Sequence, residues 1–479
     1  MLPKEPKGRP TGVLRVSTVN PRYFTNDGVH AVLLAGTHTW ATLQDEGTPA
    51  PAKFDYTAYI RFMVGHNYNL MQLWPWWLSN TGTVNNAPIQ FSAPPYPWMR
   101  IGPGFANDGR LKFDFTQLNQ AYFDRMRART IQAGQSGIYV SIYLFNSYDF
   151  QFNVNPTDGN PFERANNING VSCPNICPTD NSQIPAQVWT YEKNYIRKLI
   201  DAVNDLDNVL YNVSNESGSP YSDTWEASVI GEVKSYEATK PKQHPIGMGF
   251  QYKGGTDQKL YNSAADWVSP AFGGGGLNVP IDATGQCPTR TGNGGATNPL
   301  SPNCKVVIND TDHDCGVCGT QAWVWENFTR GNNALFMDQY LVEAPHTSFL
   351  GYNNNPSPPC SNQQCTTVDP QWDPVRNALT DIIAYANKID LINMTPHDSL
   401  STSDFCLANP GSQYLVYSTS GSFTLLTTAG TYVFEWFNPT THAIVRTGSI
   451  RTGTSKPFSA PFSGDAVLWL HQQKNGGIS

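Results

Sequence analysis

The sequence has few charged residues and no long apolar run. Only 14% of its 479 residues are charged, against about 25% in an average soluble domain. Its 31 basic and 38 acidic residues give a net charge of −7, which argues against nucleic-acid binding, because that function normally requires a basic face. No apolar run approaches the roughly 18 residues that span a bilayer, so we expect no association with a membrane.

Aromatic residues are abundant instead, with 13 Trp, 22 Tyr and 23 Phe. Few charges, many aromatics and loops rich in Asn, Gly and Thr suggest an exported protein with uncharged, adhesive surfaces. Sugars are one class of ligand that suits such surfaces. We therefore expect a secreted or periplasmic protein. The amino-terminal residues lack a hydrophobic signal core, so any export signal has been removed or was never present in this chain.

The nine cysteines also favour export, because most of them form close pairs in loops rich in Pro, Asn and Gly. The pairs are Cys173/Cys177, Cys287/Cys304, Cys315/Cys318 and Cys360/Cys365, with Cys406 left over. Disulfides that staple loops are the preferred interpretation. Free thiols and a zinc site at Cys315, Cys318 and His313 are the alternatives, although no second Cys-x-x-Cys follows.

Eight short apolar runs alternate with helical patterns along most of the chain. They cover residues 31–36, 68–74, 137–144, 208–215, 245–250, 266–269, 305–309 and 334–337. Most of the runs lack alternation, as is typical of parallel strands that are covered on both faces. The pattern predicts an α/β fold, a (β/α)₈ TIM barrel over residues 11–400. A doubly wound open sheet is the alternative, but no early strand is followed by Gly-x-Gly-x-x-Gly.

Beyond residue 405 the pattern changes to short strands separated by turns of Thr, Ser and Gly. Their spacing of roughly 8–12 residues is typical of antiparallel strands. We therefore expect a small C-terminal antiparallel β-sandwich domain over residues 405–475.

Active sites of these barrels lie at the carboxyl ends of the strands, which turns the strand prediction into a set of candidate residues. Carboxylates, aromatics and amides dominate the set, and its near lack of Lys and Arg argues against phosphate chemistry. The candidates are His38, Trp40, Trp74, Trp76, Tyr143, Asn215, Glu216, Tyr252, Asp310, Asp312 and His313.

Glu216 directly follows the fourth strand and should project into the barrel mouth, unless it only stabilises the dipole of the next helix. Asp310 and Asp312 follow the seventh strand and would face the same side if that strand continues. Their alternatives are an Asx-turn that ends the strand, or a metal site shared with His313. Glu326 lies in a helix between the seventh and eighth strands, so we interpret it as structural.

Three tryptophans in Trp74-Pro75-Trp76-Trp77 cannot all be expected to point inward. At least one should form a platform against a sugar ring. Two carboxylates beside aromatic platforms are what glycoside hydrolysis requires: one protonates the leaving oxygen, and the other attacks the anomeric carbon or activates water.

Three segments carry a family resemblance: Asn20-Pro21-Arg22-Tyr23-Phe24, Leu34-Ala35-Gly36-Thr37-His38-Thr39-Trp40 and Val213-Ser214-Asn215-Glu216. Together they resemble the clan A glycoside hydrolases, and within that clan the apiosidase-like proteins, over about residues 11–390. The C-terminal part resembles the domain named as collagen-binding that often follows those barrels.

The resemblance implies a retaining mechanism. Asn215-Glu216 matches the clan's strand-four pair, so Glu216 would be the acid/base. The clan usually has Glu after strand seven, whereas this chain has Asp310 and Asp312, of which Asp310 is the preferred nucleophile. Gln72 and Trp74 stand where many members carry Arg.

The sequence thus predicts a retaining glycoside hydrolase acting on a plant or microbial polysaccharide or oligosaccharide, without cofactor or metal. The other residues would shape the sugar subsites. A non-catalytic carbohydrate- or matrix-binding protein on a barrel scaffold is the second hypothesis. A metal-dependent hydrolase using Asp310, Asp312 and His313 is the third.

Overall fold

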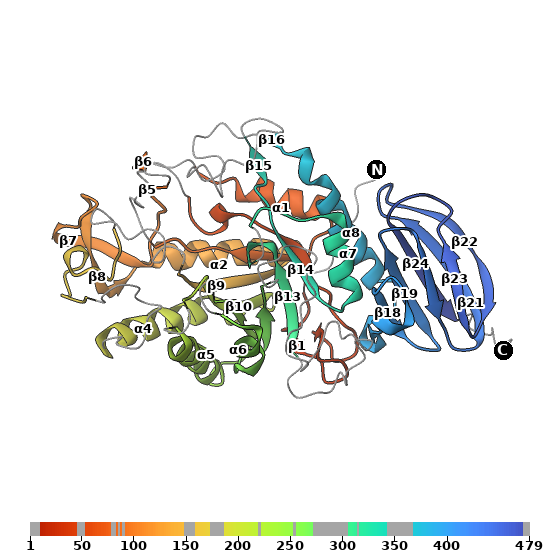
Figure 1. Cartoon of the computed structure of the whole chain (residues 1–479). Coiled ribbons are helices and arrows are strands. Elements are labelled where there is room, and N and C mark those ends of the chain that lie inside the picture. The colour runs from red at the N-terminus through yellow and green to blue at the C-terminus, as the bar shows by residue number, and fades with distance from the viewer. Residues whose placement is uncertain are drawn as a thin grey trace.

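The computed structural model describes residues 10–45, 53–77, 83–84, 87–88, 92–147, 159–172, 186–218, 222–251, 255–271, 305–313, 316–342 and 367–472. Helices surround a closed parallel barrel, and antiparallel sheets follow it (Figure 1). None of the described helices combines the length and apolar character needed to cross a membrane.

Eight parallel strands close the barrel in the order β10-β11-β12-β13-β14-β3-β4-β9. Each predicted strand is present, so the (β/α)₈ prediction is confirmed. The strands are β3 (Ala35–His38), β4 (Leu70–Leu73), β9 (Tyr139–Asn146), β10 (Val209–Asn215), β11 (Ile246–Gly249), β12 (Trp267–Ser269), β13 (Val306–Asp310) and β14 (Asn333–Met337). All their residues are buried, which explains why the sequence shows continuous apolar runs rather than alternation.

Helices cover the outside of the barrel and bury one apolar stripe each against it. They are α1 (Tyr56–Gly65), α2 (Gln120–Gln135), α4 (Ala186–Val203), α5 (Asp223–Glu237), α6 (Asp257–Asn262), α7 (Gln321–Thr329) and α8 (Asp373–Ala386). In α5 the buried stripe includes two carboxylates, Glu226 and Glu237, among Trp225, Val229 and Ile230. Buried carboxylates need partners, and both of these have them.

Two glycines of β11 make room inside the barrel. A Cβ atom on Gly247 would lie 2.0 Å from Cε2 of Trp267, so the indole ring lies directly against the backbone there. A Cβ atom on Gly249 would lie 2.9 Å from Cε1 of His313. The first glycine lets Trp267 fill the barrel floor, and the second admits a histidine ring near the carboxyl ends of the strands.

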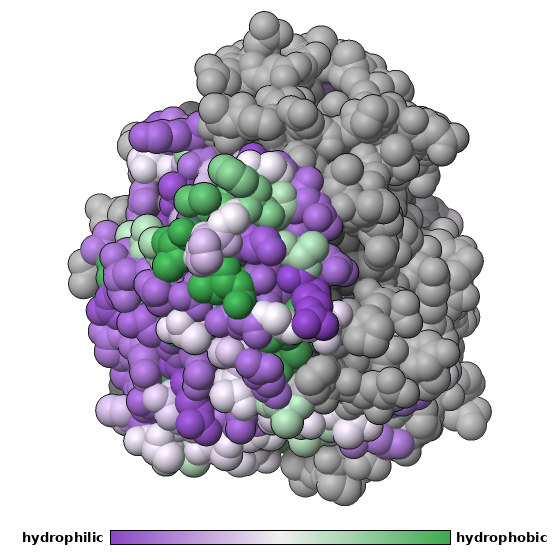
Figure 2. Space-filling model, turned by 90° about the vertical axis from the view of Figure 1, so that its left-hand side faces the viewer, coloured by the Kyte–Doolittle hydropathy of each residue, from purple (hydrophilic) through white to green (hydrophobic). Residues whose placement is uncertain are grey.

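A β-hairpin of β7 (Trp98–Phe105) and β8 (Leu111–Leu118) extends from the barrel between β4 and α2 (Figure 1). Its tip exposes apolar side chains: Phe105 is 70% exposed and pairs with Leu111, which is 42% exposed. Figure 2, which views this end of the molecule, shows apolar residues gathered among polar ones.

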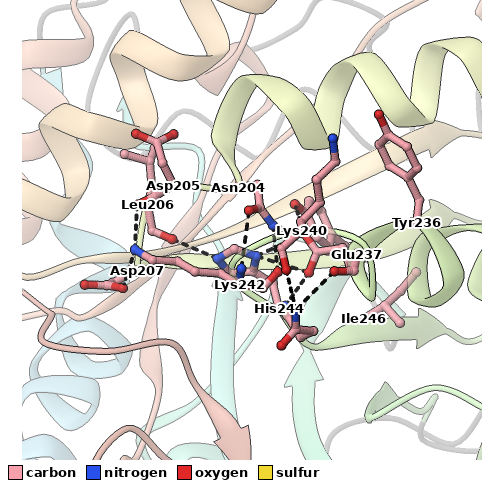
Figure 3. A network of polar contacts seen from close by, with 12 residues as sticks. Asn204, Asp205, Leu206, Asp207, Tyr236, Glu237, Lys240, Lys242, His244 and Ile246 are labelled. Atoms are coloured by element: carbon pink, nitrogen blue, oxygen red, sulfur yellow. Dashed lines mark hydrogen bonds and ion pairs between the residues drawn. The ribbon is translucent and has the colours of Figure 1, made fainter.

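A buried polar network closes the amino end of the barrel, between α5 and β11 (Figure 3). The Glu237 carboxylate accepts hydrogen bonds from Asn204 Nδ2 at 2.9 Å and Tyr211 Oη at 2.8 Å. It also accepts the backbone N–H of His244 and faces the Nδ1 atom of that residue at 3.1 Å. Nε2 of His244 lies 2.8 Å from the carbonyl oxygen of Leu206. A network at the amino end of the barrel strands serves stability rather than catalysis.

The C-terminal part is antiparallel, as predicted. A six-stranded sheet has the order β17-β18-β19-β24-β21-β22, and β20 pairs with β23 beside it. The strands are β17 (Thr395–Pro396), β18 (Cys406–Asn409), β19 (Gln413–Ser418), β20 (Ser422–Leu426), β21 (Gly430–Asn438), β22 (Ala443–Thr452), β23 (Ser455–Ser459) and β24 (Ala466–Gln472). Short two-stranded pairs complete the described fold: β1 (Arg15–Val16) with β2 (Phe24–Thr25), β5 (Thr83–Val84) with β6 (Ala87–Pro88), and β15 (Leu341–Val342) with β16 (Thr367–Val368).

This sheet packs against α7 and α8 of the barrel (Figure 1). The ring of Trp325 stacks on Tyr417 with centroids 6.3 Å apart, and Tyr385 contacts Phe437 at 5.4 Å. The hydroxyl of Tyr385 donates to Glu435 at 2.7 Å. One hydrophobic cluster therefore runs from the barrel into the sheet.

Candidate active site

The barrel mouth, where the carboxyl ends of the strands meet, brings together residues that are distant in the sequence. Nε2 of His38, at the end of β3, lies 2.9 Å from Oδ1 of Asp310, at the end of β13. The strand β14 lies between β3 and β13, so the two side chains meet inside the barrel. Both are almost fully buried, at 0% and 2% exposure.

The chain turns sharply after Asp310. The strand ends there, and a short 3₁₀ helix (Thr311–His313) begins. The backbone N–H of Asp312 donates to Oδ1 of Asp310 at 3.0 Å, which is the Asx-turn alternative. The strand therefore does not continue, and the condition under which Asp310 and Asp312 would share a strand face is not met.

The two aspartates differ in their electrostatics. Burial opposes the charge of Asp310, but the proximity and hydrogen bond of His38, together with His313, lower its pKa overall. Burial raises the pKa of Asp312 well above its usual value, and the negative charges of Glu216 and Asp310 raise it further. Asp310 is thus held in its ionised form, whereas the neutral form of Asp312 is favoured.

Tyr143, on the third barrel strand β9, contacts the end of the fourth strand. Its hydroxyl lies 3.5 Å from Oδ1 of Asn215, at the end of β10. Burial raises the pKa of Tyr143 well above its usual value, and the charges of Asp310, Asp312 and Glu216 add to this effect. All three carboxylates therefore act electrostatically on this one hydroxyl group.

Glu216 directly follows β10 and is only 5% exposed. Its φ angle of 47° lies in the left-handed region, which a residue with a Cβ atom adopts at a cost of roughly 1–3 kcal/mol. Such strain persists only where the surrounding structure enforces it, and it is concentrated at functional sites. The observation favours the interpretation of Glu216 as a site residue over that of a helix-end carboxylate.

His313 is held by two contacts. Its Nδ1 atom lies 2.9 Å from Oγ of Ser269, and its ring lies against Gly249. Burial lowers the pKa of His313, so the neutral imidazole is favoured. In the described ranges, no group of three or more His, Cys, Asp or Glu residues is arranged to hold a metal ion.

The tryptophans depart from the prediction. Trp74, Trp76 and Trp77 are all buried, so the expectation that they cannot all point inward is wrong. Trp74 stacks on His38 with ring centroids 5.5 Å apart and meets the edge of Tyr143 at 5.3 Å. The three rings lie in two separate hydrophobic clusters: Trp74 and Trp76 share one, and Trp77 belongs to the other.

Trp76 remains beside Trp74 and donates from Nε1 to the carbonyl oxygen of Trp40 at 3.1 Å. Trp77 instead packs against Trp98 at 4.9 Å, outside the barrel mouth. Trp40, Trp74 and Trp76 therefore form one buried aromatic cluster with Tyr143 around the mouth. Whether they contact a sugar stays a prediction.

Several buried polar atoms at the mouth have no hydrogen-bond partner within the described residues. They are Nδ1 of His38, Nε2 of Gln72, both amide atoms of Asn146 and Oδ2 of Asp312. Buried polar groups are normally satisfied, so atoms of this kind mark where a polar ligand or water binds. Asn146 is the last residue of β9 and so one of the strand-end positions at which the sequence predicts the active site.

A residue missed by the sequence analysis is Glu226, on α5, which contacts the residue next to Glu216. Its carboxylate, 1% exposed, accepts hydrogen bonds from Ser217, Ser222 and Gln251. The signal was available: a Glu stands on the apolar stripe of a helix that follows the fourth strand.

Other candidates lie elsewhere. Tyr252 falls outside the described residues. Glu326 lies on α7 and acts electrostatically on Tyr417 of the C-terminal sheet, consistent with a structural role. Asp338 forms a buried pair with Arg376, at 2.6 Å.

Of the cysteines, Cys406 is free and buried, and Cys318 is disulfide-bonded to a residue outside the described part. The remaining members of the predicted pairs also lie outside the described residues.

Comparisons with known proteins establish the fold alone. No family model matches the chain, and no curated protein matches it. Among solved structures it is similar to a glycoside hydrolase family 5 protein from Bacteroides vulgatus, with 14% identity, a TM-score of 0.61 and coverage of 98% of this chain and 95% of that one. It is also similar to a protein described as a glycoside hydrolase, with 12% identity, a TM-score of 0.59 and coverage of 96% and 97%. The likeness spans both the barrel and the C-terminal sheet.

Proposed function

We propose that the protein is a retaining glycoside hydrolase. The observation that carries the proposal is a buried carboxylate at each of two strand ends: Asp310, 2.9 Å from Nε2 of His38, ends β13, and Glu216 directly follows β10. Retaining glycosidases use two carboxylates, and the resemblance to clan A implies that they stand at strand ends four and seven. The similar barrels described as glycoside hydrolases support the same reaction class.

In the first step Asp310 attacks the anomeric carbon and forms a covalent bond to it. Glu216 donates its proton to the glycosidic oxygen as the bond between that oxygen and the anomeric carbon breaks. In the second step Glu216 takes a proton from water, and the water oxygen displaces Asp310. The sugar leaves with its original configuration, and both carboxyl groups return to their starting states.

Asp310 is preferred over Asp312 as the nucleophile because their electrostatic environments differ. A nucleophile must be ionised, and His38 favours the ionised form of Asp310. Asp312 favours its neutral form, which can donate a hydrogen bond to a sugar hydroxyl from the oxygen that lacks a partner within the described residues. His38 also fixes the orientation of the Asp310 carboxylate through its stack on Trp74.

The test is a set of variants assayed on aryl glycosides and polysaccharides. We expect Glu216→Gln to abolish hydrolysis of natural glycans with the fold intact. In Asp310→Ala, added azide should restore turnover of an activated aryl glycoside and give a glycosyl azide of inverted configuration. The same azide product from Asp312→Ala would reverse the two roles, and full activity of Glu216→Gln on a glycan would refute the proposal.

We further propose that the substrate is a plant or microbial polysaccharide and that the protein acts outside the cytoplasm. The low charge, the abundant aromatics and the paired cysteines support export. A polysaccharide panel with product analysis would identify the glycan.

A further inference from the structure

The residue that follows Glu216 is anchored to a buried acid. Ser217 is fully buried, and its hydroxyl donates a short hydrogen bond to Oε1 of Glu226, on the first turns of α5. The other oxygen of Glu226 accepts from Nε2 of Gln251, just after β11, and from Oγ of Ser222 at 3.2 Å. One carboxylate therefore ties together the chain after β10, the chain after β11 and the start of α5.

This anchor lies where the backbone is strained. Glu216 has a left-handed conformation, and the residue next to it in the chain is the one held by Glu226. Rotation of the backbone away from this conformation would carry the Ser217 hydroxyl off the carboxylate. The hydrogen bond thus opposes the relaxation that would swing the Glu216 side chain out of the barrel mouth.

We propose that Glu226 is a positioning residue that fixes the direction of the Glu216 side chain by holding Ser217. The inference rests on the proposed role of Glu216 as acid/base. Both oxygens of Glu226 are occupied by donors from Ser217, Ser222 and Gln251, so Glu226 acts on Glu216 through the backbone of its neighbour.

The chemistry of the anchor explains why a carboxylate stands there. Glu226 lies on the same buried stripe of α5 as Val229 and Ile230. Burying an apolar side chain at this position would cost less free energy than burying a carboxylate. Burial raises its pKa to about 7, although the donors from Ser217, Gln251 and Ser222 oppose this shift. Only a carboxylate offers two acceptor oxygens to two strand ends, since Gln would offer one acceptor and one donor.

The experiment measures how the rate depends on the leaving group. A displaced acid/base should slow the cleavage of poor leaving groups and spare activated ones, because only poor leaving groups need the proton. The probes are aryl glycosides of one cleaved sugar, from dinitrophenyl to unsubstituted phenyl. For Glu226→Gln we expect kcat/KM on the phenyl glycoside to fall about 10–100-fold, as for a misplacement near 1 Å, and kcat/KM on the dinitrophenyl glycoside to change less than about threefold.

Ser217→Ala removes the donor of the same hydrogen bond and should show the same selective loss. It therefore tests the positioning role even if Glu226→Gln does not fold.

The matched control is Glu192→Gln. Glu192 is also a fully buried glutamate of the outer helices, and it bonds only Trp225 Nε1, at 3.1 Å, among its described contacts. It should leave the leaving-group dependence unchanged.

The outcomes separate the two proposals. If folded Glu226→Gln and Ser217→Ala keep the wild-type leaving-group dependence while Glu216→Ala loses the phenyl substrate, the positioning role is refuted and the acid/base role stands. If Glu216→Ala itself retains full activity on the phenyl glycoside, the proposed function fails first. An equal loss on all leaving groups in both variants would also overturn the positioning role, because it would indicate general damage to the site.

Discussion

Replacing Glu237 by Gln should destabilise the barrel strongly without affecting its chemistry. The Glu237 carboxylate accepts from Asn204, Tyr211 and two nitrogens of His244 (Figure 3). Nδ1 of His244 faces the Glu237 carboxylate, and Nε2 faces the carbonyl oxygen of Leu206. Gln keeps one acceptor oxygen and turns the other into a donor, so about two charge-assisted hydrogen bonds are lost.

Each such bond is worth roughly 1.5–3 kcal/mol, so we expect a loss of about 3–5 kcal/mol, which is also the usual cost of breaking a buried pair. The entropy of unfolding is about 2.1 cal/mol/K per residue, or roughly 1 kcal/mol/K for a chain of 479 residues. The Tm should therefore fall by roughly 3–5 °C. Calorimetry measures the shift, and kcat at a temperature well below the transition should match the wild type, since the network lies at the amino end of the strands.

The control is Asp201→Asn, which removes a more exposed partner of Lys240, at 2.5 Å on a nearby surface. Pairs of this kind contribute about 0–1 kcal/mol, so its Tm should change by about 1 °C or less. A Tm of Glu237→Gln within about 1 °C of the wild type would refute the reasoning. A folded variant with a reduced kcat would show instead that the network communicates with the barrel mouth.

Two further predictions concern the site. Burial raises the pKa of Glu226 from 4.5 to about 7, so its contribution to stability is fully present below pH 4.5 and is lost as the pH rises through 7. Relative to pH 4, the wild type should lose up to about 3 kcal/mol more than Glu226→Gln by pH 9, and melting curves with the same pH dependence for both proteins would contradict this. Gly249→Ala places a methyl group 2.9 Å from Cε1 of His313, so the ring must move off Ser269 and activity should fall at least about tenfold. Gly65→Ala, with nothing within 4 Å, is the control; equal activity of the two variants would show that the position of His313 is unimportant.

The barrel was predictable because its strands are buried on both faces. Continuous apolar runs such as Val209–Asn215 leave a clear signal in the sequence, and their number and spacing fix the fold class. The C-terminal strand β23 carries no such signal, because Ser455–Ser459 is short, polar and mostly exposed.

The site was predictable only to the level of strand ends. Position assigns Glu216 and Asp310 to the barrel mouth, but the hydrogen bond from His38 joins residues 272 positions apart. A single turn ends β13 at Asp310, and the local sequence leaves it as one of several alternatives. This turn puts Asp310 and Asp312 in different surroundings, which favour the ionised form of Asp310 and the neutral form of Asp312. The burial of three neighbouring tryptophans likewise depended on two separate cores that no local pattern reveals.

The contact between Trp325 and Tyr417 makes the C-terminal sheet part of the outer wall of the barrel. The helix that carries Trp325, α7, begins eight residues after His313, so the sheet braces the segment that follows the candidate nucleophile. Cutting the chain between the two parts would open this shared hydrophobic cluster to water rather than release an independent module. We therefore expect related proteins to carry the barrel and the sheet together rather than either part alone.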